Sequence, residues 1–402
     1  MNPPDVDAVE FVLTLGRALH RYGTPAHRLE EALRVCCKQL GLDAEVFSTP
    51  TTLIMSFGDP AELRTRMMRV ESGELDMGKL AEVDRLADQV AGRVITAAEG
   101  VDRLEQIIAA RPRFGHGVST LAHGVKAGAM AVFFGGSLED VAVAAGIGFS
   151  LGLLAQYAKR STDQARVFEL VGAAFAAFAA GVLSSVWSAL TPSLVTEAAM
   201  IILLPGLSLT VAMTELATRN PIAGTARLMS AVIVLLELVV GVALGERLAE
   251  AIVDVHQAAP EALPEWAQWV ALVGSSLGIS VVVQARSSAF GWILAGCFTG
   301  YVGSRVGTAW LGPGMGVLVG AFALGVLSNA YARWQKRPAQ IIQIPAVLTL
   351  VPGSMGFRGM SSLLDHDTLT GVETVFAMFV VATAIVAGLL IANAVVSPRR
   401  SL

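Results

Sequence analysis

The sequence predicts a mainly α-helical polytopic membrane protein, with ten transmembrane helices in two inverted five-helix repeats behind a small N-terminal cytoplasmic α/β domain. Two observations lead to this fold class. Of the 402 residues, 54% are hydrophobic and only 15% are charged, which lies well outside the composition of soluble domains. Apolar segments then follow one another from about residue 117 to residue 396, and they contain the same passages twice.

The repeated passages indicate a duplication. FAAGVLS at 178–184 returns as FALGVLS at 322–328, and LLPGLSLTVAMTEL from Leu203 returns as LVPGSMGFRGMSSL from Leu350. Each copy holds five apolar segments, and an odd number makes the second copy enter the membrane from the opposite side. Inverted repeats of this kind are a common architecture of secondary transporters, in which two pseudo-symmetric halves move about a central site.

Ten segments after Gly117 have the length of about 18 to 25 residues that crosses the hydrocarbon core of a bilayer. They are 118–136, 138–158, 166–188, 195–216, 223–245, 265–285, 288–305, 314–334, 339–363 and 371–396. The chain is accordingly divided into the α/β domain (1–115), the first repeat (116–246), an extracytoplasmic loop (247–264) and the second repeat (265–402).

The charges of the loops orient these segments. With the N-terminus inside, the outer loops carry only Arg247 and Arg305, whereas the inner loops and the tail carry many more cations. The inner cations are Lys159, Arg160, Arg166, Arg219, Arg286, Arg333, Lys336, Arg337, Arg399 and Arg400. This asymmetry follows the positive-inside rule and predicts that both termini are cytoplasmic.

The first 115 residues have the pattern of a small soluble domain. Two amphipathic helices, the second after Pro25, precede two short strands in AEVFSTPTTLIMSFG (44–58), and RTRMMRVESG (64–73) adds a third. Further amphipathic stretches cover 79–95 and 102–108. The hydroxyls Ser48, Thr49, Thr51 and Thr52 and the histidines His20 and His27 leave open a membrane-anchored enzyme, although no nucleophile elbow or metal-ligand spacing is present.

Two Pro-Gly pairs are the most specific local signals. Pro205-Gly206 and Pro352-Gly353 fall in the fourth and ninth segments, where proline removes a backbone donor and glycine relaxes the chain. The helix after each break begins with free N–H groups and a positive dipole end, which suits a carboxylate. The candidate substrate-binding residues are Pro205, Gly206, Ser208, Thr210, Asn329, Pro352, Gly353, Ser354 and Arg358. Proline kinks that serve packing alone are the alternative.

Ionisable side chains inside the segments are costly and therefore indicate function. Lys126 lies near the middle of the first segment and Glu237 near the middle of the fifth, while Glu215 lies nearer an end. These three are the candidate proton-coupling residues; a purely structural Lys126–Glu237 pair is equally compatible with the sequence.

Composition also limits the classes of binding partner that can be expected. The net charge of −4, with no large basic face evident, argues against a nucleic-acid partner. The three cysteines, Cys36, Cys37 and Cys297, are too few and too poorly placed for a disulfide framework. No metal site, cofactor, catalytic residue or cleavable signal peptide is predicted. The expected partners are a small-molecule substrate, protons and the lipid bilayer, and a homo-oligomer is left open.

The chain resembles the bacterial threonine/serine exporter family over nearly its whole length. The resemblance is carried by LGRALHRYGTPAHRLEEALRVCCKQLGLDAEVFSTPTTLIMSF near the N-terminus, FFGGS at 133–137, LLPGLSLT at 203–210, GTARL at 224–228 and LVPGSMGFRG at 350–359. It implies a multi-pass protein of the bacterial inner membrane that exports threonine, serine or similar small amino acids by proton coupling. A dicarboxylate such as succinate is the alternative cargo, because some relatives with separate halves are linked to succinate export.

Overall fold

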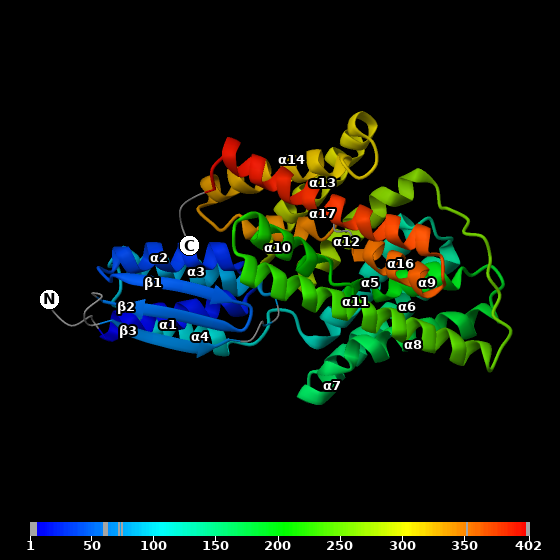
Figure 1. The fold of residues 1–402 in the computed structure, drawn as a ribbon, viewed down its shortest axis with the longest axis horizontal. Coiled ribbons are helices and arrows are strands. Elements are labelled where there is room, and N and C mark those ends of the chain that lie inside the picture. The colour runs from blue at the N-terminus through cyan, green and yellow to red at the C-terminus, as the bar shows by residue number, and fades with distance from the viewer. Residues whose placement is uncertain (1–5, 59–62, 71–72, 74, 351–352, 399–402) are drawn as a thin grey trace.

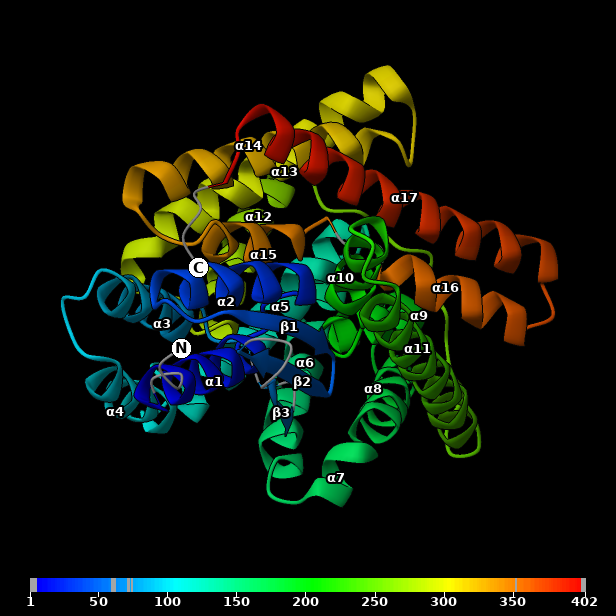
Figure 2. The same cartoon turned by 60° about the vertical axis from the view of Figure 1, so that its left-hand side comes forward.

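The computed structural model describes residues 6–58, 63–70, 73, 75–350 and 353–398, and the structural statements below concern these residues. Figure 1 shows an N-terminal segment, residues 6–109, at one end of the molecule and a larger group of long helices at the other. The last described residue, Pro398, lines a cavity together with residues of α2 and α3, so the chain returns toward the N-terminal segment (Figures 1 and 2).

The N-terminal segment contains a three-stranded antiparallel sheet in the order β1-β2-β3, as expected. Buried residues alternate along β2, where Leu53, Met55 and Phe57 point inward, so one face of the sheet packs on helices. Phe47 and Met67 on the flanking strands are exposed. The elements are α1 (Val6–Arg21), α2 (Ala26–Gln39), β1 (Ala44–Thr49), β2 (Thr52–Phe57), β3 (Arg64–Arg69), α3 (Met77–Ala91) and α4 (Ala97–Ala109).

Helices make up most of the remaining described chain, and a helix or a broken helix occupies each of the ten predicted ranges. The first half comprises α5 (His116–Phe133), α6 (Leu138–Ala158), α7 (Thr162–Arg166), α8 (Phe168–Ser184), α9 (Pro192–Ala199), η1 (Met200–Ile202), α10 (Gly206–Ala217) and α11 (Pro221–Glu250). The second half comprises α12 (Glu265–Val282), η2 (Ser287–Ala289), α13 (Phe290–Leu311), α14 (Gly316–Gln335), α15 (Gln340–Val347), α16 (Gly353–Leu364) and α17 (Thr368–Val395).

By length and composition, four of the described helices can each cross a membrane, namely α6, α11, α14 and α17. The pair formed by 192–202 and α10, bent by 59°, passes the same test together and makes a fifth candidate. Among the others, α8 is apolar but has only 17 residues, and α5 carries His116, His123 and Lys126. The protein is therefore a mainly helical membrane protein with several candidate spans.

The repeated passage makes the same contact in both halves. A Cβ on Gly181 of α8 would lie 2.7 Å from Cβ of Ala249 on α11, and one on Gly325 of α14 would lie 2.5 Å from Cβ of Ala392 on α17. Each glycine thus permits the helix of the third predicted segment in its half to approach the helix of the fifth. The sequence repeat is also a repeat of helix packing.

The hydrophobic core crosses the expected domain boundaries. One buried cluster joins the N-terminal segment to α12–α15 and α17, and a second fills the first half. A hydrogen bond reinforces the first contact, because Met77 N of α3 donates to Val283 O at 2.9 Å. Phe114 N, in the connection between α4 and α5, donates to the neighbouring Gln284 Oε1 at 2.8 Å. The N-terminal segment is therefore fixed against the turn that follows α12.

Candidate functional site

Both expected helix breaks involve residues that start a new helix. The first interrupts the chain between η1 and α10, and Pro205 precedes α10 without any side chain capping its free N–H groups. The second lies between α15 and α16, where Gly353 begins α16. Pro352, the other residue of the second Pro-Gly pair, lies outside the described residues.

The two breaks meet. A Cβ built on Gly353 would lie 3.2 Å from Cα and 3.3 Å from the backbone nitrogen of Gly206. The first turns of α10 and α16 are therefore in backbone contact, and a side chain larger than hydrogen at Gly353 would require the backbone at Gly206 to move away. The sequence predicted each break separately; the structure brings them to one point.

A cavity of about 330 Å³ lies at this point and is lined by both halves of the chain. Gly206, Leu207, Gly353 and Ser354 contribute the first turns of α10 and α16. The wall is mostly apolar, with a small set of polar side chains consisting of Lys126, Gln268, Ser275, Tyr301, Thr349 and Ser354. An apolar cavity with a few polar groups is the usual form of a small-molecule site.

Lys126 reaches the cavity from α5 and is only 8% exposed. Its aliphatic stem passes close to α12 because position 278 is glycine; a Cβ there would lie 2.9 Å from Cγ of Lys126. Within the described residues, its ammonium has neither a hydrogen bond nor an ion pair with protein. The expected partner Glu237 is partly buried on α11 and forms no ion pair with Lys126.

Arg358 forms an ion pair with Glu197 outside the described lining of the cavity. Its Nε lies 2.7 Å from Oε2 of Glu197 on α9, and its guanidinium lies 4.9 Å from the centre of the Phe134 ring. Glu197 is 7% exposed and Arg358 is 53% exposed by side chain, so the pair lies at the edge of the helices. Arg358 is absent from the described lining of the cavity. This ion pair instead ties α9 to α16, one helix from each broken segment.

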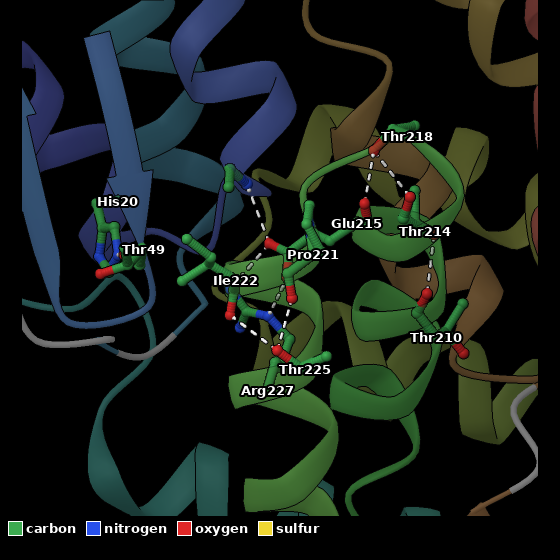
Figure 3. A network of polar contacts seen from close by, with 11 residues as sticks. His20, Thr49, Thr210, Thr214, Glu215, Thr218, Pro221, Ile222, Thr225 and Arg227 are labelled. Atoms are coloured by element: carbon green, nitrogen blue, oxygen red, sulfur yellow. Dashed lines mark hydrogen bonds and ion pairs between the residues drawn. The ribbon is translucent and has the colours of Figure 1, made fainter.

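Glu215, which the sequence placed near a span end, is completely buried. Figure 3 shows it between α10, α11 and the N-terminal segment. Its Oε1 accepts a hydrogen bond of 3.1 Å from Ala26 N, the first residue of α2, and its Oε2 pairs with Nε of Arg227 at 3.1 Å. We call these three residues the α2 latch, since they attach α2 to the helix that follows the first break.

The remaining candidates lie away from the cavity wall. Thr210 donates its hydroxyl to Gly206 O at 3.1 Å, and Asn329 donates to Asn393 Oδ1 and to Val396 O, both at 2.8 Å. Ser208 lines a separate cavity between α10, α11 and the turn after β1, together with Arg69 and Arg227. The sequence missed Gln268, Ser275, Tyr301 and Thr349, because uncharged polar residues inside apolar segments give no distinctive signal.

Among the described residues, no hydrogen bond joins the hydroxyl of Ser48, Thr49, Thr51 or Thr52 to the ring of His20 or His27. Nε2 of His20 lies 3.1 Å from the carbonyl oxygen of Thr49, and the Thr49 hydroxyl donates to Thr52 O at 3.3 Å. Burial raises the pKa of both Cys36 and Cys37 to about 12, which keeps these thiols protonated. No group of three metal-ligating side chains occurs among the described residues.

His27 makes the N-terminal segment sensitive to acid. Burial, followed by the charge of Arg28, lowers the pKa of His27 to about 4, whereas an unfolded histidine has a pKa of about 6.5. As the pH falls below about 6.5, the unfolded state binds a proton that the folded state does not, so stability is lost down to about pH 4. We expect His27 to account for about 2 kcal/mol of the free energy of unfolding lost between about pH 7 and about pH 5.

Chemical unfolding of the detergent-solubilised full chain at the two pH values measures this loss, with His27→Gln as the matched variant. Other groups titrate in the same window, so the informative quantity is the difference between the two proteins. An equal loss in both would contradict the assignment to His27.

Comparisons with known proteins agree with this arrangement. Residues 10–249 match the threonine/serine exporter family model, and residues 268–395 match a second model described as "Threonine/Serine exporter, ThrE". The boundary between the two matches falls near the connection between the two helical halves. No solved structure matches the chain significantly.

Curated relatives include several fungal proteins named pheromone-regulated membrane protein 10. The one from Eremothecium gossypii is 28% identical over 369 residues, covering 88% of this chain and 49% of the relative. Those of Saccharomyces cerevisiae and Candida albicans are 29% and 27% identical, over 88% of this chain and 47% and 33% of the relatives. The chain thus spans about half or less of these relatives. Since the first family match alone covers more than half of the chain, the protein belongs to the threonine/serine exporter family.

Proposed function

We propose that this protein is a secondary active transporter that exports small amino acids of the threonine and serine type, driven by the proton gradient. The observation that carries the proposal is the contact between Gly206 and Gly353 at a cavity shared by both halves. Broken helices that meet between two related halves place backbone N–H groups and carbonyls around a substrate, as a transporter needs. Membership of the exporter family supports the same assignment.

The proposed topology is ten spans in two inverted repeats, with both termini in the cytoplasm of a bacterial cell. Contacts among the connections support it. The N-terminal segment contacts the turn after α12 and the end of α10, both of which this topology places inside. On the proposed outside, Thr191 N donates to Asp140 Oδ1 at 2.8 Å, and Ala258 N donates to Leu190 O at 3.2 Å.

Cysteine labelling tests this topology in intact cells. We expect Glu261→Cys, in the long connection after α11, to react with an impermeant thiol reagent, and Gln335→Cys, at the end of α14, to react only after lysis. Both positions are exposed, and the three native cysteines are buried and give little background. The reverse labelling pattern would reject the proposed orientation.

Transport by the reconstituted full chain tests the function. Proteoliposomes loaded with labelled threonine, serine or succinate are compared with and without an imposed proton gradient. We expect threonine and serine to move uphill only when the gradient is present. Succinate transport without amino acid transport would replace the proposed cargo with the dicarboxylate alternative.

For proton coupling we propose Glu237, with Glu215 as the second candidate. Glu215 is held by Arg227 and by the Ala26 amide, whereas Glu237 has no ion pair within the described structure and can exchange a proton at less structural cost. Glu237→Gln should therefore fold normally and exchange substrate downhill, but fail to concentrate it when a pH difference is imposed. Full pH-driven uphill transport by this variant would direct attention to Glu215.

A further inference from the structure

We propose that Lys126 binds the carboxylate of the substrate, opposite the first turns of α10 and α16, and that the site accepts molecules with a single carboxylate. The proposal rests on the transport function above and names its substrate chemistry. It gives Lys126 a role in binding rather than the structural pairing with Glu237 that the sequence left open.

The state of Lys126 is the first observation. A buried ammonium without a partner is costly, because burial removes its hydration and no anion replaces it. Lys126 is 8% exposed, lines the cavity and has no hydrogen-bonding partner among the described residues. It is also the one charged side chain among the described residues that line this cavity. A ligand that supplies a negative charge would satisfy it.

The two helix starts are the second observation. Gly206 and Gly353 begin helices of 12 residues each, α10 and α16, and both glycines line the same cavity as Lys126. Each helix start carries unsatisfied N–H groups and roughly half a positive charge. No side chain caps α10, so its first N–H groups are available to a carboxylate oxygen. Three positive groups from three separate helices therefore converge on one small volume.

The distribution of the other cations decides between one carboxylate and two. Arg358 is paired with Glu197, and Arg227 is paired with Glu215. Arg305 is exposed and donates to Gln268 Oε1 and to the Tyr301 hydroxyl, both at 3.3 Å. None of these three arginines is among the described residues that line the cavity, so a second substrate carboxylate would be buried without a cation in contact with it. The opposite end of an amino acid has better partners. Its ammonium can approach the carbonyl end of α15 near Thr349, and a side-chain hydroxyl can bond Ser275 or Ser354.

Binding to the purified full chain tests the proposal through three variants. Lys126→Met removes the charge and keeps the apolar stem, Lys126→Arg keeps the charge, and Lys38→Met removes an exposed lysine of α2 as the matched control. Competition against labelled threonine compares serine with serinamide, which lacks the carboxylate, and with succinate. A charge-assisted hydrogen bond corresponds to about 10- to 100-fold in affinity.

We expect wild-type protein and Lys38→Met to prefer serine over serinamide, and Lys126→Met to bind threonine about 10- to 100-fold more weakly and to lose that preference. Lys126→Arg should retain part of it. Lys126→Met should also be at least as heat-stable as wild type, because it removes an unpaired buried charge. Unchanged threonine affinity and an unchanged preference for serine in Lys126→Met would overturn the proposal while transport itself stands.

A failure of the proposed amino acid transport can be distinguished from a failure of the Lys126 carboxylate site. If the wild-type protein transports no amino acid but binds another monocarboxylate in a Lys126-dependent way, the proposed cargo is wrong and the carboxylate site is supported. Tight succinate binding that survives in Lys126→Met would reject the site. Both readouts use the same protein preparations.

Discussion

Gly353→Val and Gly206→Val are expected to abolish transport while leaving expression and membrane insertion near wild type. The reason is steric and local. Even a single Cβ at Gly353 would lie 3.2 Å from Cα of Gly206, and the two further methyl carbons of valine would enter either that contact or the cavity. The starts of α10 and α16 would be forced apart, and backbone N–H groups would no longer approach a ligand closely.

The matched control is Gly146→Val on α6, where a Cβ would meet no other atom within 4 Å. The amino acid change is the same, but no close contact is lost. Initial rates of threonine efflux from proteoliposomes should therefore fall to background for the two break variants and remain near wild type for the control. Normal transport by Gly353→Val would leave the breaks with a packing role only.

The positions of these breaks could be predicted from the sequence because proline and glycine act on their own backbone. The three strands of the N-terminal segment were predictable for a similar reason, since Leu53, Met55 and Phe57 alternate with less buried neighbours. The depth of Lys126 in its segment was also evident. Each of these inferences depends on residues near one another in the chain.

Side-chain partners across helices could not be predicted in this way. Hydropathy gives the depth of a residue in a span but not the neighbour it faces. Lys126 of α5 and Glu237 of α11 could therefore be expected to pair, although no ion pair joins them among the described residues. Arg358 was predicted to bind the substrate because the sequence gives no sign of its ion-pair partner, Glu197, which lies 161 residues away in the chain. Glu215 was expected near a membrane surface because the sequence did not reveal that α2 covers it.

Glu215→Ala is expected to lower the stability of the whole protein by about 3 kcal/mol, the lower end of the cost of breaking a buried ion pair by removing one partner. The substitution leaves the Arg227 guanidinium without its carboxylate and the Ala26 N–H without its acceptor. The value is at the lower end because the Arg227 side chain is 23% exposed and can recover some hydration. The α2 latch should open first, because Glu215 joins the N-terminal segment to α10.

Thermal unfolding and limited proteolysis of the solubilised full chain measure the two parts of this prediction. Glu215→Ala should lower Tm and expose the chain between α1 and α2 to protease. Glu250→Ala is the control, because its partner Arg247 and Glu250 itself are 84% and 55% exposed and such surface pairs contribute about 0 to 1 kcal/mol. Adding Arg227→Met to Glu215→Ala should recover part of the lost stability, since it removes the unpaired cation. If Glu215→Ala unfolds at the same temperature as wild type and Glu250→Ala, the α2 latch does not hold the N-terminal segment in place.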